Sequence, residues 1–211
     1  MALDAEQQEQ ISAFKAWTEQ YGNWIVGASL VVAAVAAGNW GWHWYTQREA
    51  AAAGAIYEQF SEAVGAKDAA KARDLAAALL QQHPSSAYAT FAALTQARAS
   101  LDAGDTAAAK AQLHWVIDKS SSKELVTLAR VRLAGVLLDE KAYDEGLALL
   151  QGDAPAALAA EVSDRRGDLL LAQGKAADAR VAYGKALEQA SAQNPLRPVI
   201  QSKFDALPAA G

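Results

Sequence analysis

The longest apolar stretch of the chain runs from Trp24 to Tyr45 and contains no Asp, Glu, Lys or Arg. A helix of this length rises by about 33 Å, which is enough to cross a hydrocarbon core of about 30 Å. Tryptophan and tyrosine prefer the headgroup boundary of a bilayer, and they gather at both ends of the stretch. The pattern therefore predicts a transmembrane anchor over 24–45 with the membrane-interface residues Trp17, Tyr21, Trp24, Trp40, Trp42, Trp44 and Tyr45.

Two other interpretations of this stretch have less support. A signal peptide has small residues for its cleavage site at 34–36, but the region before the apolar run is acidic rather than basic. Cleavage there would also leave a tryptophan-rich new terminus. A buried helix of a soluble core has no reason to concentrate tryptophan at its ends.

Ahead of the anchor, apolar residues recur every three to four positions, at Ile11, Phe14, Trp17 and Tyr21. This period predicts an amphipathic helix over 8–22. Such a helix lies at the membrane surface or docks on a membrane partner, and the two roles are compatible. We therefore expect a tail over 1–23, the anchor over 24–45 and a repeat domain over 46–211.

Beyond Arg48 the polar and apolar positions keep a helical period with almost no strand-like run, so this part is predicted to be all-α. Glycine, proline and asparagine residues interrupt the period at short intervals. They divide the domain into helices near 47–64, 68–82, 86–103, 106–118, 123–139, 142–151, 155–173, 175–190 and 196–206.

Small and large residues recur at fixed offsets from three predicted turns. Gly174 has a small residue seven positions before it, and small, large and small residues five, nine and twelve positions after it. Gly104 and Lys141 repeat the pattern, which fits least well at Asp153, and the three turn residues are 37 and 33 positions apart. Tetratricopeptide repeats have a period of 34 residues. The spacing favours a tetratricopeptide-like solenoid of helical hairpins over a generic helical bundle.

The ends and the inner surface of such an array have distinct roles. Repeat arrays need caps, and residues 197–207 are predicted to form a C-terminal capping helix with Val199, Ile200, Phe204 and Leu207 on one face. The inner helices line a concave groove that receives peptides or partner proteins. The repeat offsets predict that this protein-binding groove contains Phe91, Leu94, Arg98, Leu128, Val131, Glu161, Asp164 and Asp168.

Composition and charge exclude several classes of function. The chain has no cysteine, which excludes a disulfide framework, a thiol nucleophile and a cysteine metal cluster. Residues 49–211 contain 20 acidic and 17 basic residues, so the repeat domain has no basic surface for nucleic acid. The predicted function is therefore protein binding at a membrane.

The sequence contains no recognisable catalytic constellation. His83 precedes a proline in a predicted turn, and no two histidines have the spacing of metal ligands. A glycine-rich phosphate loop and a Gly-x-Ser-x-Gly elbow are also missing. We expect a protein that is not an enzyme, with no cofactor and no metal site; an enzyme without a known motif is the alternative.

The chain resembles YfgM-type ancillary subunits of the bacterial SecYEG translocon over nearly its whole length. The most specific part of the resemblance is the anchor and its flanks, with Glu9-Gln10-Ile11, Phe14-Lys15, Trp17, Tyr21-Gly22 and Gly41-Trp42-His43-Trp44-Tyr45. The repeat part resembles the tetratricopeptide-like domain of that family at His83-Pro84-Ser85-Ser86-Ala87-Tyr88 and Gly174-Lys175-Ala176-Ala177-Asp178-Ala179-Arg180.

The resemblance implies a single-pass protein of the bacterial inner membrane, with its N-terminus in the cytoplasm and its repeats in the periplasm. It implies three kinds of partner: the SecYEG translocon, a membrane-anchored periplasmic chaperone of the prolyl-isomerase type, and unfolded secreted polypeptides. Charge alone gives no orientation, because Lys15 on one side of the anchor is matched by Arg48 on the other. A scaffold for envelope assembly, in cytochrome maturation or cell-wall synthesis, is the alternative to the chaperone or adaptor role.

Overall fold

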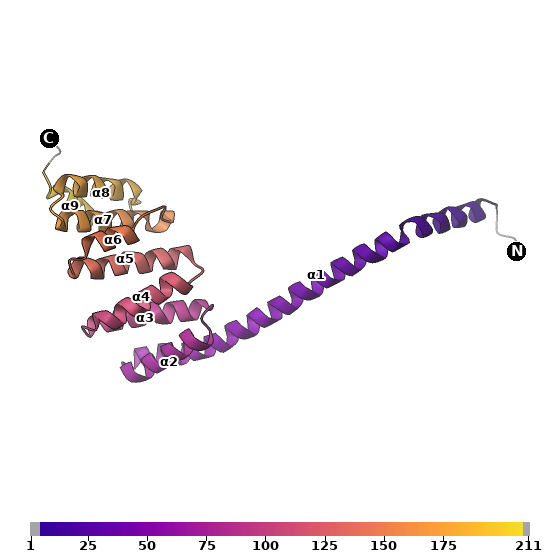
Figure 1. Ribbon diagram of the computed structural model, residues 1–211, viewed down its shortest axis with the longest axis horizontal. Helices are drawn as coiled ribbons and strands as arrows, with labels where there is room; N and C mark the ends of the chain where they lie inside the picture. The colour runs from indigo at the N-terminus through magenta and orange to yellow at the C-terminus, as the bar shows by residue number, and fades with distance from the viewer. Residues whose placement is uncertain (1–4, 209–211) are drawn as a thin grey trace. The chain divides into compact units, whose positions relative to one another are not determined.

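The computed structural model describes the backbone of residues 5–208 and the side chains of residues 10–24 and 26–208. The first four residues of the predicted tail and the last three of the predicted repeat domain lie outside this range. Within it, every regular element is a helix (Figure 1). The elements are α1 (Ala5–Gly65), α2 (Ala69–Gln82), α3 (Ala87–Asp102), α4 (Thr106–Lys119), α5 (Lys123–Asp139), α6 (Tyr143–Leu149), the 3₁₀ turn η1 (Ala156–Leu158), α7 (Ala159–Ala172), α8 (Ala176–Gln189) and α9 (Arg197–Asp205).

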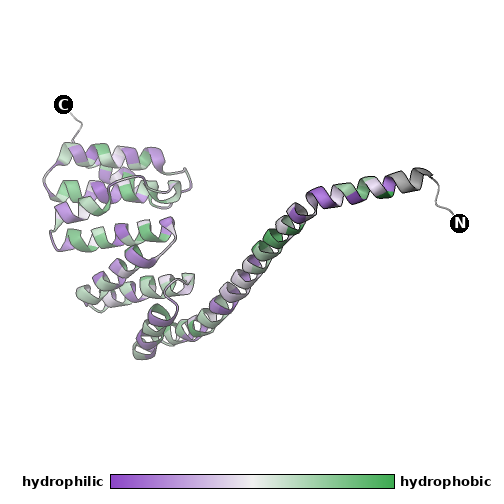
Figure 2. Ribbon diagram, turned by 45° about the vertical axis from the view of Figure 1, so that its right-hand side comes forward, coloured by the Kyte–Doolittle hydropathy of each residue, from purple (hydrophilic) through white to green (hydrophobic). Residues whose placement is uncertain are grey.

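The chain divides into two compact units, Met1–Ala51 and Ala52–Gly211. In the first unit, hydrophobic residues are concentrated in the middle of α1 (Figure 2). Among the described residues, no single helix is long and apolar enough to cross a membrane. The segments Gln10–Trp24 and Val26–Gly65, which meet at an angle of 42°, reach that length and composition only as a pair.

The second unit is a row of helical hairpins whose turns share one geometry. Lys67, Gly104, Lys141 and Gly174 stand at the turns with φ of 58°, 79°, 63° and 79°. The left-handed conformation lets the next N–H reach back to a carbonyl in the last turn of the preceding helix, which ends that helix with a Schellman motif. The four bonds are Asp68 to Ala63 at 2.9 Å, Asp105 to Ser100 at 2.8 Å, Ala142 to Leu137 at 2.8 Å and Lys175 to Leu170 at 3.0 Å.

The turn at Lys67 belongs to a hairpin that the sequence offsets did not identify. The equivalent positions around Lys67 are Phe60, Ala72, Ala76 and Leu79, and all four are buried. The expected pattern requires a large residue nine positions after the turn, but alanine stands there as Ala76. The predicted order of small and large residues was therefore too strict, because a small residue can also be buried at this position when a large residue packs against it.

Four successive helices, α2 to α5, begin at local side-chain caps. Asp68 accepts a hydrogen bond from the Lys71 N–H at 3.1 Å, and Asp105 accepts one from the Ala108 N–H at 2.9 Å. Ser86 and Ser122 cap α3 and α5 in the same way. Each cap satisfies an N–H that has no partner within its own helix. This local chemistry explains why the observed boundaries of these helices lie within one residue of those predicted.

The core is a series of small clusters rather than one centre, which is the packing expected of a repeat array. One cluster joins the end of α1 to α2 and α3 around Phe60 and Leu79, and the next joins α3, α4 and α5 around Leu113 and Leu133. A third lies between α5 and α7 around Leu169, and the last lies between α8 and α9.

Two glycines let helices approach closely within these clusters. A Cβ on Gly167 would lie 2.6 Å from Cδ1 of Tyr183, and a Cβ on Gly146 would lie 2.9 Å from Cδ2 of Leu169. Both separations are shorter than carbon atoms tolerate. The small residues that the offsets predicted at these positions are therefore required by packing.

Three details of the predicted elements are wrong. The helix predicted over 155–173 begins as the 3₁₀ turn η1, because Leu158, at φ −119° and ψ 1°, separates that turn from α7. The helix predicted over 142–151 ends at Leu149, so Asp153 lies in an exposed loop rather than on a packed face. In the capping helix Ile200 is fully buried, but Val199 is 52% exposed and points away from the core.

Two arginines, one on each helix, attach the capping helix α9 to α8. The Arg180 guanidinium donates to the carbonyls of Phe204 at 2.7 Å and Leu207 at 2.6 Å, and it lies 3.9 Å from the Phe204 ring centroid. These carbonyls lie at and just beyond the end of α9, where a helix has no internal donors left. Arg197 in turn donates to the carbonyls of Leu187 and Ala190 at the end of α8.

Candidate functional site

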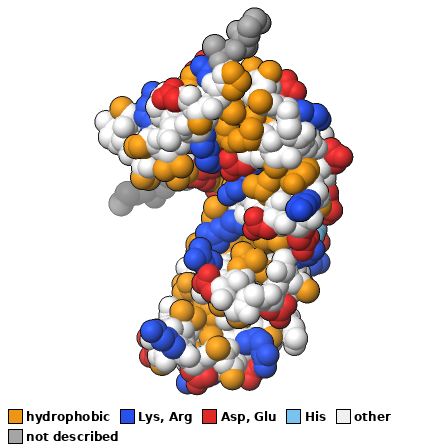
Figure 3. Space-filling view, turned by 90° about the vertical axis from the view of Figure 1, so that its left-hand side faces the viewer, with side chains coloured by type: hydrophobic (Ala, Val, Ile, Leu, Met, Phe, Trp, Pro, Cys, Tyr) orange, Lys and Arg blue, Asp and Glu red, His pale blue; other side chains and the backbone are white. Residues whose placement is uncertain are grey.

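The first helices of three successive hairpins, α3, α5 and α7, line a surface recess of about 680 Å³. Figure 3 shows Lys and Arg side chains gathered along a hollow on one side of the repeats. Apart from one threonine, the uncharged residues lining the recess are leucine, valine and glycine. The lining residues are Arg98, Leu101, Thr106, Leu113, Arg132, Gly135, Val136, Asp139, Glu140 and Arg165.

Four of the predicted groove residues have side chains at least partly exposed on these helices. Arg98 lines the recess itself, and Phe91 on the same helix is 41% exposed. Leu128 of α5 and Glu161 of α7 are half-buried. Burial is the largest cause of the raised pKa of Glu161, and repulsion by Asp164 adds to it, while attraction by Arg132 opposes both.

The other four predicted groove residues take part in packing or in internal ion pairs. Leu94 is 6% exposed and Val131 is 8% exposed, and each belongs to a hydrophobic cluster between hairpins. Asp164 and Asp168 pair with Lys203. Only the exposed residues and the arginines of the recess are therefore available to contact a partner at the groove.

The three arginines of the recess have different environments. Arg98 pairs with Asp102 on its own helix at 2.9 Å, and both side chains are largely exposed. Arg165 pairs with Asp168 at 3.1 Å, and its guanidinium lies against Gly135, where a Cβ would be 3.4 Å from Cζ. Arg132 has no hydrogen bond or ion pair within the described part of the chain.

Electrostatics distinguish Arg132 further. Its side chain is exposed by area, yet desolvation by the neighbouring helices is the largest cause that lowers its pKa. Repulsion by Arg98 lowers the pKa further, and attraction by Glu161 raises it. Arg132 is therefore a partly desolvated cation that no described carboxylate contacts directly.

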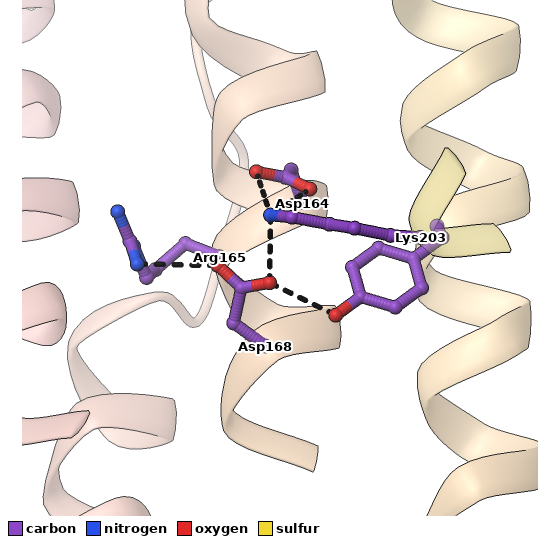
Figure 4. Close-up of polar contacts among 5 residues, drawn as sticks. Asp164, Arg165, Asp168 and Lys203 are labelled. Carbon is purple, nitrogen blue, oxygen red and sulfur yellow. Dashed lines mark hydrogen bonds and ion pairs between the residues drawn. The ribbon is translucent and has the colours of Figure 1, made fainter. Parts of the chain in front are cut away.

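A second polar cluster joins the last three helices (Figure 4). Lys203 of α9 donates to both carboxylate oxygens of Asp164, at 2.8 and 2.9 Å, and to Asp168 at 2.7 Å. The Tyr183 hydroxyl of α8 donates to Asp168 at 2.9 Å. Burial raises the pKa of Asp164, although its hydrogen bond with Lys203 opposes this effect, and burial beside Asp168 raises the pKa of Tyr183. Each carboxylate is paired, so this cluster holds the cap on the array.

The first unit exposes a large apolar surface. The rings of Phe14, Trp17 and Tyr21 follow one another along α1 with centroids 6.1 and 6.0 Å apart. Trp17, Tyr21 and Trp24 are 49%, 46% and 80% exposed. The second aromatic group is just as open: Trp40, Trp42, Trp44 and Tyr45 are 75%, 67%, 50% and 58% exposed. Soluble surfaces rarely show such continuous apolar area, which marks a membrane or protein contact.

His83 is the C-cap of α2, as expected for a helix-end residue. No group of three or more His, Asp or Glu side chains among the described residues has the geometry to hold a metal ion.

Sequence reasoning missed Arg132, Arg165 and Gly135. The arginines at 98, 132 and 165 are 34 and 33 residues apart, close to the repeat period, so aligning the basic residues by repeat would have identified them. The role of Gly135 was hidden, because only the fold shows that Arg165 of the next hairpin lies against it.

Comparison with known proteins gives one consistent result. A family model described as a tetratricopeptide repeat-like domain matches residues 15–209. The chain is 32% identical to the "Ancillary SecYEG translocon subunit" of Neisseria gonorrhoeae, over 98% of this chain and all of that protein. Proteins of the same name from Haemophilus influenzae and Escherichia coli are 25% and 27% identical, over 90% and 87% of this chain and 93% and 88% of their own lengths. No solved structure matches the chain.

Proposed function

This chain belongs to the family of ancillary SecYEG translocon subunits with a tetratricopeptide repeat-like domain, and we propose that it is a membrane-anchored adaptor of the translocon. The observation that carries the proposal is the identity of 32% to a protein of that name along the whole of both chains. The family model describes a repeat domain and the relatives are named as ancillary subunits, which supports a non-catalytic adaptor.

In this proposal the segment 24–45 crosses the bacterial inner membrane once, with the N-terminus in the cytoplasm and the repeats in the periplasm. The support is chemical. The segment is helical, contains no charged residue and exposes its tryptophans at both ends. Moving such a surface from water into a bilayer is favourable by about 25 cal/mol for each Å² of apolar area, and the interface accommodates the tryptophans.

The tail helix is proposed to contact the translocon in or beside the membrane. Its exposed rings lie in one row, and lipid or another helix can cover them. The repeat domain is proposed to bind partner proteins in the periplasm. These are emerging secreted polypeptides, as a chaperone would bind them, and the membrane-anchored chaperone of the prolyl-isomerase type that the family resemblance implies.

Site-specific photo-crosslinking in native membranes tests the proposal. A crosslinking residue at Trp17 or Trp42 is expected to give adducts with SecYEG subunits, and the exposed position Arg73 in α2 serves as the control outside the membrane segment. Adducts with envelope-assembly enzymes in place of SecYEG would support the scaffold alternative and contradict the translocon role. Protease added to spheroplasts is expected to digest residues 49–211; protection of this domain would reverse the orientation.

A further inference from the structure

The recess between α3, α5 and α7 contains one arginine, Arg132, that no described carboxylate contacts, while Arg98 and Arg165 each pair with a carboxylate just outside the lining. Its lining has three arginines against two acidic residues, Asp139 and Glu140. Glu140 is already paired with Lys110 at 2.7 Å. Arg132, in the middle helix, forms no hydrogen bond or ion pair with any described residue. The recess therefore has unused capacity for an anion.

The two flanking arginines also have donors to offer. Arg98 and Asp102 form a pair at the surface, with side chains 76% and 59% exposed, and such pairs contribute little and exchange readily. Arg165 uses one terminal nitrogen for Asp168, and its Nε is buried, so a ligand can reach only its terminal nitrogens. A guanidinium has five N–H donors, so each arginine can donate to a further carboxylate oxygen.

The arrangement of these cations indicates the shape of the anion. The three arginines belong to the first helices of three successive hairpins, so they follow one another along the array. The floor between them contains Leu101, Val136 and Gly135. An extended polypeptide with carboxylates along its length fits this pattern, because its backbone can lie on the apolar floor while its side chains reach the arginines.

Charge outside the recess excludes large polyanions. Residues 49–211 carry 20 acidic and 17 basic residues, so the rest of the domain repels nucleic acid or a strongly anionic membrane. A short acidic segment gains attraction inside the recess and experiences little of this repulsion, because salt screens charges beyond about 10 Å.

We propose that the recess between α3, α5 and α7 binds an extended acidic segment of a partner protein, whose Asp or Glu side chains pair with Arg98 and Arg132. The proposal rests on the proposed function, in which the repeats bind proteins, and it specifies the chemistry of the ligand. Arg165, held between Asp168 and Gly135, forms the far end of the site. The repulsion of Arg132 by Arg98 is relieved when a carboxylate lies between them.

Fluorescence anisotropy with the full chain in non-ionic detergent tests the proposal. The probe is a short labelled peptide of alternating glutamate and threonine, acetylated and amidated so that it has no terminal charge. The expected result is saturable binding that weakens as salt rises. A peptide with glutamine in place of glutamate is expected to bind at least about tenfold more weakly, since it loses the charge-assisted hydrogen bonds.

Matched variants assign the binding to the recess. The double variant Arg98→Gln/Arg132→Gln is expected to weaken binding by at least about tenfold. The control Lys71→Gln/Arg73→Gln removes two exposed cations from α2 and should leave binding unchanged. Circular dichroism of both variants shows whether they remain folded.

Several outcomes would overturn the proposal. These are no binding of the glutamate peptide, equal binding of the glutamine peptide, and equal losses in the two double variants. Tight binding of the glutamine peptide only when its C-terminal carboxylate is free would assign the arginines to a chain terminus instead. Arginine-dependent binding of vesicles containing an anionic phospholipid, without peptide binding, would assign them to a membrane. Crosslinking to SecYEG is measured separately, so translocon association and acidic-peptide binding can fail independently.

Discussion

The substitution Gly167→Ala tests whether close approach of α7 and α8 holds the end of the array together. The added Cβ would lie 2.6 Å from Cδ1 and 2.9 Å from Cζ of Tyr183. Tyr183 is 1% exposed, and its hydroxyl donates to Asp168, so the ring has no free space into which to turn. Either the helices separate or the tyrosine leaves its position.

The expected cost follows from two opposing effects. Overpacking a well-packed core destabilises by about 1–3 kcal/mol. Alanine in place of glycine inside a helix returns about 1 kcal/mol. The separation is short and the obstacle is a rigid ring, so we place the cost at the upper end of that range. The free energy of unfolding should therefore fall by about 1–2 kcal/mol, which lowers the melting temperature by about 2–8 °C in a domain of this size.

The assay is urea unfolding of the full chain in detergent, followed by circular dichroism at the helix band. Hydrogen exchange should show the largest loss of protection in α7, α8 and α9. Gly65→Ala is the matched control, because nothing lies within 4 Å of a Cβ there, and it should be neutral or stabilising. A Gly167→Ala protein as stable as the wild type would refute the reasoning. A further check is Tyr183→Leu in the Gly167→Ala background, which removes the ring and should make the added methyl tolerable.

Three further predictions concern the turns and the cap. Lys141→Gly should raise the free energy of unfolding by about 0.5–1 kcal/mol in urea titrations, because φ of 63° strains a side chain but not glycine; a loss of stability would contradict this. Lys203→Met removes the cation that pairs with Asp164, leaves Asp168 with Arg165 alone, and should cost about 2 kcal/mol at neutral pH, whereas the control Lys185→Met should cost almost nothing. Burial already holds the pKa of Asp164 above its ordinary value, so the folded state binds this proton more tightly than the unfolded state does. The loss in Lys203→Met should therefore shrink as pH falls, and a constant loss would contradict the role of the pair. Arg180→Met should increase hydrogen exchange in α9, because two carbonyls at and beyond its end lose their donor, and unchanged exchange there would show that apolar contacts alone hold the cap.

The sequence was sufficient for the features that depend on neighbouring residues. The helix limits follow from caps and turn residues within a few positions of each boundary, as at Ser86, Asp105 and Gly174. The repeat offsets correctly identified Gly167, Ala179, Tyr183 and Ala186 as packed positions, and Gly167 and Tyr183 are in contact. The method failed at Lys67 because large and small residues exchange places there: Phe60 stands seven positions before the turn and Ala76 nine positions after it.

The composition of the binding surface could be predicted only in part. Arg98 was placed on the inner surface by its repeat position, and it lines the recess. Leu94 and Val131 were placed there by the same argument, but they are buried between hairpins. Groove residues and packing residues lie on neighbouring faces of the same helix. Consecutive residues are about 100° apart around a helix, so a shift by one position moves a side chain from the groove into the packing between hairpins. An offset in the sequence does not fix that rotation.

What the sequence by itself determined is local or linear. It gave the helical class from the period of apolar residues, the repeat from the spacing of the turns, and the charge-free segment with tryptophans at both ends. The tertiary structure alone decided which distant side chains meet. Lys203 reaches Asp164 and Asp168 across 39 and 35 residues of sequence, and Arg165 lies on Gly135 of the preceding hairpin. These contacts depend on the angle and separation at which hairpins stack, which are set by the sum of many small packing interactions and not by any single residue.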